Sequence, residues 1–165
     1  AFGTGGHEST QTALAGLEDS KLEGRRMLDV GTGSGVLAIA AAHLGVTSLV
    51  AVDIDPVAIE NARLNLHVNL GVEHVTQRIV LQQGSAKDAG DEPFDIIVAN
   101  IESHILLPMV PDLLQRLAMG GCIIFSGLLR REERTFLDGL IESGLTIDGR
   151  WQRGDWFSCR AYVVD

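Results

Sequence analysis

The 165-residue sequence is poor in cysteine, in aromatic side chains and in long uncharged apolar runs. Its two cysteines, Cys122 and Cys159, form no C-x-x-C pair, so no disulfide framework is indicated and we expect buried, reduced thiols as in a cytoplasmic protein. The five histidines show no metal-ligand spacing, and we expect no metal site. The longest uncharged apolar run, residues 36–46, is too short to cross a bilayer, and we expect no membrane association.

Basic residues are also scarce relative to acidic ones. The sequence has 13 Lys and Arg against 22 Asp and Glu, a net charge of −9. An acidic surface disfavours nucleic acid as a partner and favours a basic protein or a small cation. Nothing in the sequence indicates an oligomeric state. With 45% apolar residues, the chain is long enough to form one domain with a sizeable core.

Segments typical of strands and helices alternate along the chain. We expect strands at residues 26–30, 48–52, 78–82, 94–99, 122–126, 145–153 and 157–164, with a turn at 120–121 before the fifth. We expect helices at residues 9–17, 35–44, 56–70, 105–118 and 131–143. Helices between strands predict a mostly parallel sheet covered on both faces, and the short last turn makes the final two strands antiparallel. The predicted fold is α/β and Rossmann-like, with a seven-stranded, mostly parallel sheet and an antiparallel last strand.

A glycine-rich turn follows the first expected strand. Gly31, Gly33 and Gly35 lie between that strand and an apolar helix, where the first backbone N–H groups of the helix face a ligand. Asp53 directly follows the next expected strand, at its carboxyl end and 22 residues after Gly31. A carboxylate at about this spacing hydrogen-bonds ribose hydroxyls. The pattern therefore predicts a site for an adenosine-containing cofactor.

The residues around the turn favour one cofactor. A dinucleotide fingerprint needs a small residue at position 36, which is the bulky Val36. Asp29, just before the turn, would repel a pyrophosphate but suits a ligand that carries an ammonium and a sulfonium. S-adenosyl-L-methionine has both groups and no phosphate. A nicotinamide-dependent dehydrogenase is accordingly disfavoured.

Further candidates follow the other strands, at the same predicted edge of the sheet. Asn100 follows the fourth expected strand, where its carbonyl groups could accept N–H bonds from an amine and orient the lone pair of the amine toward a methyl group. His7, Glu102 and His104 are weaker candidates, with Ser103 as the expected helix cap. The remaining cofactor contacts that we expect come after the second and third strands: Ile54, Ser85 and Ala86.

Three segments carry a resemblance to a known family: residues 1–10 (AFGTGGHEST), 29–35 (DVGTGSG) and 98–101 (VANI). The chain resembles class I S-adenosylmethionine-dependent methyltransferases and, more closely, the family that methylates a large-subunit ribosomal protein (PrmA). The resemblance implies that residues 1–165 form the cofactor-binding catalytic domain, with S-adenosyl-L-homocysteine as product. It implies methylation of a lysine or N-terminal amine of a ribosomal protein, with Asn100 beside the reacting methyl. It also places the opening loop with Thr4, and the helix with Thr10, over the cofactor.

Two departures from the family keep alternatives open. The N-terminal domain by which the family recognises its ribosomal protein is absent, and the chain opens directly on loop residues, so we expect a piece of a longer protein. The residues after Asn100, Ile101 and Glu102, are also less apolar than usual in the family. They cannot form the N-P-P-Y clamp of amide and exocyclic-amine methyltransferases, which argues against that kind of acceptor. A methyltransferase for a small molecule or RNA, and a non-catalytic S-adenosylmethionine-binding domain, remain as alternatives.

Overall fold

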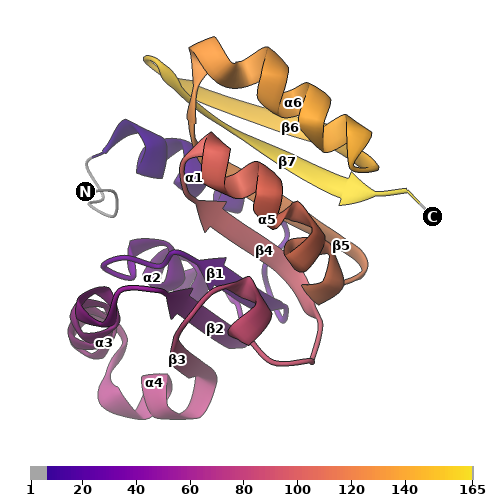
Figure 1. Ribbon diagram of the computed structural model, residues 1–165. Coiled ribbons are helices and arrows are strands. Elements are labelled where there is room, and N and C mark those ends of the chain that lie inside the picture. Colours follow the sequence, from indigo (N-terminus) through magenta and orange to yellow (C-terminus); the bar gives the residue numbers. More distant parts are fainter. Residues whose placement is uncertain (1–6, 165) are drawn as a thin grey trace.

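The structure is a computed structural model, and it describes residues 7–164. One sheet of seven strands forms its centre, in the order β3-β2-β1-β4-β5-β7-β6 (Figure 1). The strands are β1 (Arg26–Val30), β2 (Ser48–Asp53), β3 (Ile79–Gln83), β4 (Phe94–Asn100), β5 (Leu117–Leu129), β6 (Leu145–Arg153) and β7 (Trp156–Val163). The helices are α1 (Glu8–Glu18), α2 (Val36–His43), α3 (Pro56–Leu70), α4 (Val72–Arg78), α5 (Ser103–Arg116) and α6 (Glu133–Glu142), with short 3₁₀ turns η1 (Ala86–Asp88) and η2 (Arg130–Glu132).

The strand directions confirm the predicted sheet. Strands β1 to β5 are paired in parallel, and β7 runs antiparallel to both β5 and β6. The chain builds outward from β1 through β2 to β3 and then returns to place β4 on the other side of β1. The strand order therefore reverses between β1 and β4, and in open α/β sheets such a reversal leaves a crevice at the carboxyl ends of the strands.

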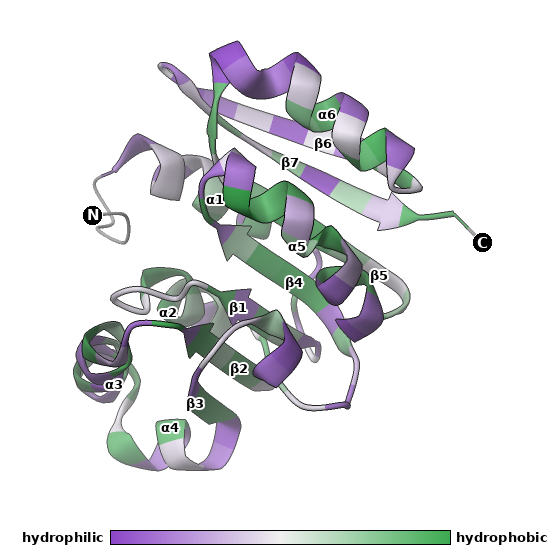
Figure 2. Cartoon of the chain, viewed as in Figure 1, coloured by the Kyte–Doolittle hydropathy of each residue, from purple (hydrophilic) through white to green (hydrophobic). Residues whose placement is uncertain are grey.

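Side chains alternate across the sheet and build a core on each face. In β1, Leu28 and Val30 pack toward α5 and α6, while Met27 packs on the opposite face with α1 and α2. This alternation is the two-residue period of a strand whose two faces are both buried. Figure 2 shows the central strands green along most of their length, whereas the edge strand β6 mixes polar and apolar residues.

The largest differences from the predicted elements are in three places, and elsewhere the bounds shift by at most three residues. Helix α4 was not predicted, because only Val75 of its seven residues is buried and so no apolar periodicity marks it. Helix α5 covers 103–116 rather than 105–118, and Ser103 is its first residue rather than its cap. Strand β5 starts at Leu117, which pairs with Phe94 of β4, so Gly120 and Gly121 lie in an irregular part of this strand instead of a turn before it.

The two cysteines differ in exposure. Cys159 is buried as expected, but Cys122 is only partly buried, because it lies where β5 leaves its regular register with β4. Within residues 7–164, no helix has both the length and the apolar character needed to cross a membrane.

Candidate functional site

A cavity of about 370 Å³ lies at the carboxyl ends of β1 to β4, where the strand order reverses. Its walls come from the turns after the first four strands and from α5. It is lined by Val30, Gly31, Gly33, Asp53, Ile54, Gly84, Ser85, Asn100, Ile101, Glu102, Ile105 and Met109. Six of these were predicted from the sequence as ligand-binding residues: Gly31, Gly33, Asp53, Ile54, Ser85 and Asn100.

The glycine turn is held against the end of β2. The N–H groups of Gly31 and Thr32 both donate to the carbonyl oxygen of Val52, at 2.9 and 3.0 Å. Gly31 has φ +74°, and a Cβ on it would lie 3.0 Å from the side chain of Ile101. A larger residue would therefore be strained and would fill the space between the turn and Ile101. The glycine keeps this side of the cavity open.

Asp53 is tied to the same turn. Its Oδ2 accepts from the Gly33 N–H at 2.9 Å, and its Oδ1 accepts from the Asp55 N–H at 3.0 Å. These bonds fix the carboxylate at the cavity wall. Each carboxylate oxygen has a second acceptor site, so Asp53 can still accept hydroxyl groups from a ligand.

Asp29 lies behind the turn rather than on the cavity wall. Its side chain is fully buried, and its Oδ2 accepts from the Thr32 hydroxyl at 2.8 Å. Its Oδ1 has no hydrogen-bond partner among residues 7–164. Burial raises the pKa of Asp29 to about 7; the Thr32 hydrogen bond opposes this rise and the charge of Asp53 adds to it. A buried acceptor without a donor fits a ligand that brings a cation or an N–H group to this turn.

Asn100 ends β4 on the cavity wall and is 7% exposed. Its Oδ1 is buried and has no partner in the described part of the chain. Gly127, with φ +78°, packs against this segment: a Cβ there would lie 2.9 Å from the Ile101 carbonyl oxygen and 3.1 Å from Asn100 Oδ1. Gly127 therefore fixes the position of Asn100. Gly127 was not predicted from the sequence, although a glycine directly after an apolar strand was a usable signal.

Helix α1 is attached to the sheet by buried hydroxyl groups. Ser126 Oγ donates to the Ser9 carbonyl at 2.9 Å, and Ser158 Oγ donates to the Thr12 carbonyl at 2.8 Å. The side chain of Thr10 is also buried, and its Oγ1 has no partner among the described residues, but it does not line the cavity. His7 caps the helix, with Nδ1 accepting from the Ser9 N–H at 3.2 Å. Thr4 lies outside the described residues.

Two other predicted residues do not line the cavity. Gly35, with φ +86°, precedes α2, and a Cβ on it would touch Ala62 of α3 at 3.4 Å. Ala86 is fully buried beneath the cavity-lining Ser85, whose backbone N–H donates to Asp88 at 2.9 Å. Both residues shape the walls without facing the space.

Helix α5 contributes cavity residues that the sequence analysis missed. Ile105 and Met109, one turn apart, add apolar surface that suits a planar base. Their spacing of four on the helix after Asn100 was the available signal. Glu102 lines the cavity and lies 3.4 Å from His104, between its Oε2 and the ring Nδ1.

Comparisons with known proteins agree with this geometry. The sequence model of the ribosomal protein L11 methyltransferase (PrmA) family matches residues 1–162. The ribosomal protein L11 methyltransferase of Geobacillus kaustophilus is 42% identical over 156 residues, which are 94% of this chain and 49% of that protein. The chain thus spans about half the length of the curated relatives it matches.

Solved structures give the same result. The crystal structure of a ribosomal protein L11 methylase from Lactobacillus delbrueckii subsp. bulgaricus matches with a TM-score of 0.88 and 36% identity, covering 96% of this chain and 80% of that one. A methyltransferase from Pyrococcus furiosus, at 18% identity and a TM-score of 0.71, covers 88% of this chain and 77% of its own and shares the fold alone. The fold is that of the class I methyltransferases. With a family match over nearly its whole length and relatives of this identity, the chain belongs to the ribosomal protein L11 methyltransferase (PrmA) family.

Proposed function

We propose that the chain is the catalytic domain of an S-adenosylmethionine-dependent methyltransferase that modifies amines of ribosomal protein L11. The observation that carries the proposal is one cavity in which the glycine turn, Asp53 and Asn100 meet at the reversal of the strand order. Membership of the family and the names of its relatives support the activity and the acceptor. The proposal extends over residues 1–165, including Thr4 and Thr10 as cofactor contacts.

The cavity residues fit S-adenosylmethionine. Asp53, anchored by the Gly33 N–H, would accept the ribose hydroxyls. Ile54, Ser85 and Met109 offer mostly apolar surface for the adenine. The Oδ1 of Asp29, which has no partner in the part of the chain that the structure describes, would support the positively charged methionine end through the glycine turn. The proposal requires neither a phosphate site nor a metal ligand.

Asn100 is the proposed catalytic residue. When bound, S-adenosylmethionine supplies a methyl group on a sulfonium, which an amine can displace in line. The amine must be neutral to attack, so the protein has to hold it with its lone pair directed at the methyl. Asn100 has a buried carbonyl oxygen that accepts from none of the residues 7–164, and it would accept an N–H of that amine. Gly127 keeps the Asn100 segment in place.

The proposed partner is a basic protein, and the charge of the chain supports it. A net charge of −9 favours encounter with a cationic ribosomal protein. Glu102, exposed at the rim of the cavity beside Asn100, adds negative charge where an amine would enter. The proposal includes a cytoplasmic location, because ribosomal proteins are made and assembled there.

The test is transfer of a labelled methyl group. The chain is incubated with methyl-labelled S-adenosylmethionine and purified, unmethylated ribosomal protein L11, and the label is located by mass spectrometry. We expect label on a lysine or on the N-terminal amine. The Asn100→Ala variant is the matched control and should leave L11 unlabelled over the same period.

Two outcomes would contradict the proposal. Label in RNA but not in protein, when a ribosomal extract is supplied, would assign a different acceptor. Binding of the cofactor in calorimetry without transfer to any component of that extract would assign a binding domain rather than an enzyme.

A further inference from the structure

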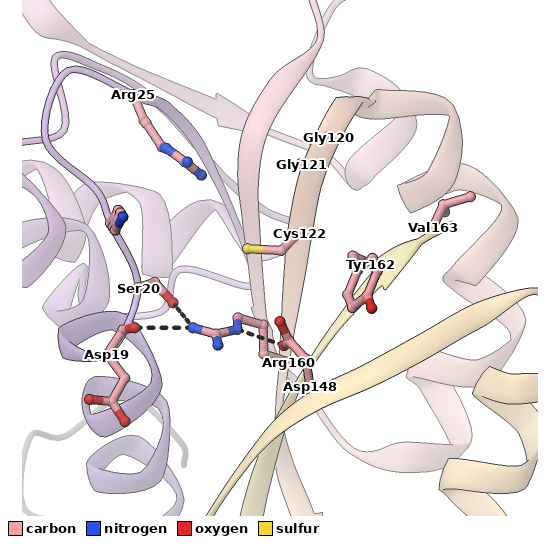
Figure 3. Close-up of a pocket in the computed structure, with 11 residues that line it drawn as sticks. Asp19, Ser20, Arg25, Gly120, Gly121, Cys122, Asp148, Arg160, Tyr162 and Val163 are labelled. Atoms are coloured by element: carbon pink, nitrogen blue, oxygen red, sulfur yellow. Dashed lines mark hydrogen bonds and ion pairs between the residues drawn. The ribbon is translucent and has the colours of Figure 1, made fainter. Parts of the chain in front are cut away.

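A second cavity, also of about 370 Å³, lies at the opposite edge of the sheet (Figure 3). Arg25, which lines it, immediately precedes β1, whereas Gly31 of the first cavity directly follows β1. At 3.3 Å per residue in a strand, the backbone at these two positions is about 20 Å apart. The second cavity is therefore separate from the candidate cofactor site.

One wall of this cavity is an irregular part of β5. Between two points of pairing with β4, at Leu117 and Cys122, β5 advances five residues while β4 advances two. The extra residues include Gly120 and Gly121, which both line the cavity. A Cβ on Gly121 would lie 2.8 Å from the Asp95 carbonyl oxygen, so only glycine fits. The hollow is thus formed by the backbone of the sheet and not only by surface side chains.

The charged side chains of the cavity leave positive charge in excess. Arg160 donates from Nε to Asp148 at 2.8 Å, and from Nη1 to the Asp19 carbonyl and the Ser20 hydroxyl at 3.1 and 3.0 Å. The Asp19 carboxylate accepts from Trp151 Nε1 at 2.9 Å. Both carboxylates of the cavity therefore already have donors.

Two cations remain. The side chains of Lys21 and Arg25 line the cavity and form no hydrogen bond or salt bridge with any of the residues 7–164. Arg25 is half-buried, so its guanidinium is partly withdrawn from solvent with no counterion among the described residues. A partly desolvated guanidinium and an ammonium that face one cavity attract an oxyanion, which a guanidinium can bind through two parallel N–H bonds.

We propose that this cavity binds a small molecule through a phosphate or carboxylate group, with Arg25 and Lys21 as its ligands. Asp148 and the end of α1 hold Arg160 in place, and Arg160 would donate to the same anion through the N–H groups that these contacts leave free. The cavity volume suits a small metabolite, whereas the net charge of the chain opposes extended nucleic acid.

Cys122 provides a probe inside the cavity. Figure 3 shows its thiol directed into the space between the guanidinium groups of Arg25 and Arg160. Burial raises the pKa of Cys122, and the two arginines oppose the rise. A bound anion would block the thiol and would also disfavour its thiolate, so alkylation should slow for both reasons. The other thiol, Cys159, is fully buried and should stay unreactive in the folded chain.

The experiment measures the alkylation rate of Cys122 by iodoacetamide, which is uncharged, against the concentration of inorganic phosphate or of acetate. Sodium chloride keeps the ionic strength constant. We expect a saturable slowing of about fivefold or more with at least one of the two anions, and an Arg25→Gln variant should weaken that anion about tenfold. Saturation by phosphate alone would assign a phosphorylated ligand, and saturation by acetate alone would assign a carboxylate.

Arg78→Gln is the matched control, because it removes one arginine near the amino edge of β3 but outside the cavity, and it should saturate like the wild type. Calorimetry with the same anion should give the same dissociation constants as the alkylation rates. The proposal would be overturned if neither anion slowed alkylation beyond chloride, if Arg25→Gln matched the wild type, or if only single-stranded RNA protected Cys122.

Discussion

The buried carboxylate of Asp29 should make the stability of the ligand-free fold fall as pH rises. Burial raises the pKa of Asp29 from 3.8 to about 7. Below pH 4 the folded and unfolded states both hold the proton, and the ionisation of Asp29 does not lower the free energy of unfolding. Between pH 4 and 7 the unfolded chain ionises while the folded chain does not, so the free energy of unfolding falls by about 1.4 kcal/mol per pH unit. Above pH 7 the full cost is present, about 4 kcal/mol.

The Asp29→Asn variant removes this ionisation. Its side-chain oxygen can still accept from the Thr32 hydroxyl, which now bonds Oδ2 at 2.8 Å. The NH2 group that replaces Oδ1 would be buried, and without an acceptor it would lower the free energy of unfolding by about 1–3 kcal/mol. Near pH 4.5 the wild type already carries about 1 kcal/mol of the ionisation cost, so we expect the variant to be less stable there by up to about 2 kcal/mol. Near pH 8 it should be more stable, by about 1–3 kcal/mol.

Urea denaturation of both proteins without cofactor, at steps from pH 4.5 to 8.5, measures this difference. The two stability curves should cross between about pH 4.5 and 6. Asp138→Asn, the same substitution at an exposed position on α6, controls for the loss of one carboxylate. A wild-type and Asp29→Asn difference that stays constant across this range would refute the reasoning. The same ionisation should make S-adenosylmethionine affinity rise between pH 6 and 8 in the wild type only.

Three further substitutions test the site. Asp53→Ala, which removes the carboxylate bonded to the Gly33 N–H, should raise the dissociation constant of S-adenosylmethionine about 10- to 100-fold in calorimetry, and near wild-type affinity would contradict its role. Asn100→Ala should lower turnover about 100-fold with cofactor affinity changed less than about threefold, whereas equal losses would assign it to binding. Gly127→Ala should lower both the melting temperature and turnover, with a loss of about 1–3 kcal/mol of stability, because the new Cβ would lie 2.9 Å from the Ile101 carbonyl oxygen. Unchanged turnover would show that Gly127 does not position Asn100.

Local patterns predicted most of the fold. Asp55 and Pro56 marked the start of α3 through capping chemistry, and the Asp55 side chain does accept from the Val57 N–H at 2.9 Å. Strand β1 was predicted to the residue because its flanks change abruptly from charged or glycine-rich to apolar. Helix α4 and the early start of β5 escaped because they depend on tertiary pairing: Leu117 belongs to β5 through its partner Phe94.

The candidate site also has a part that local patterns predicted and a part that depends on tertiary contacts. Gly31, Gly33 and Asp53 were predictable because a strand, a turn and a helix fix their spacing along the chain. The burial of Asp29 behind the turn was not, since the sequence shows a carboxylate near a ligand but not which way it faces. Gly127 and the apolar wall from α5 enter through contacts between distant segments. Their local signals, a glycine after an apolar strand and a spacing of four on a helix, do not show which residues they contact.

The central claim is that the cavity at the carboxyl ends of β1 to β4 binds S-adenosylmethionine. Backbone amide NMR shifts on addition of S-adenosyl-L-homocysteine test it most directly. The largest shifts should fall at residues 31–33, 53–54, 84–85 and 100–102, with NADH producing none of them. Shifts concentrated elsewhere, or the same shifts with NADH, would contradict the claim.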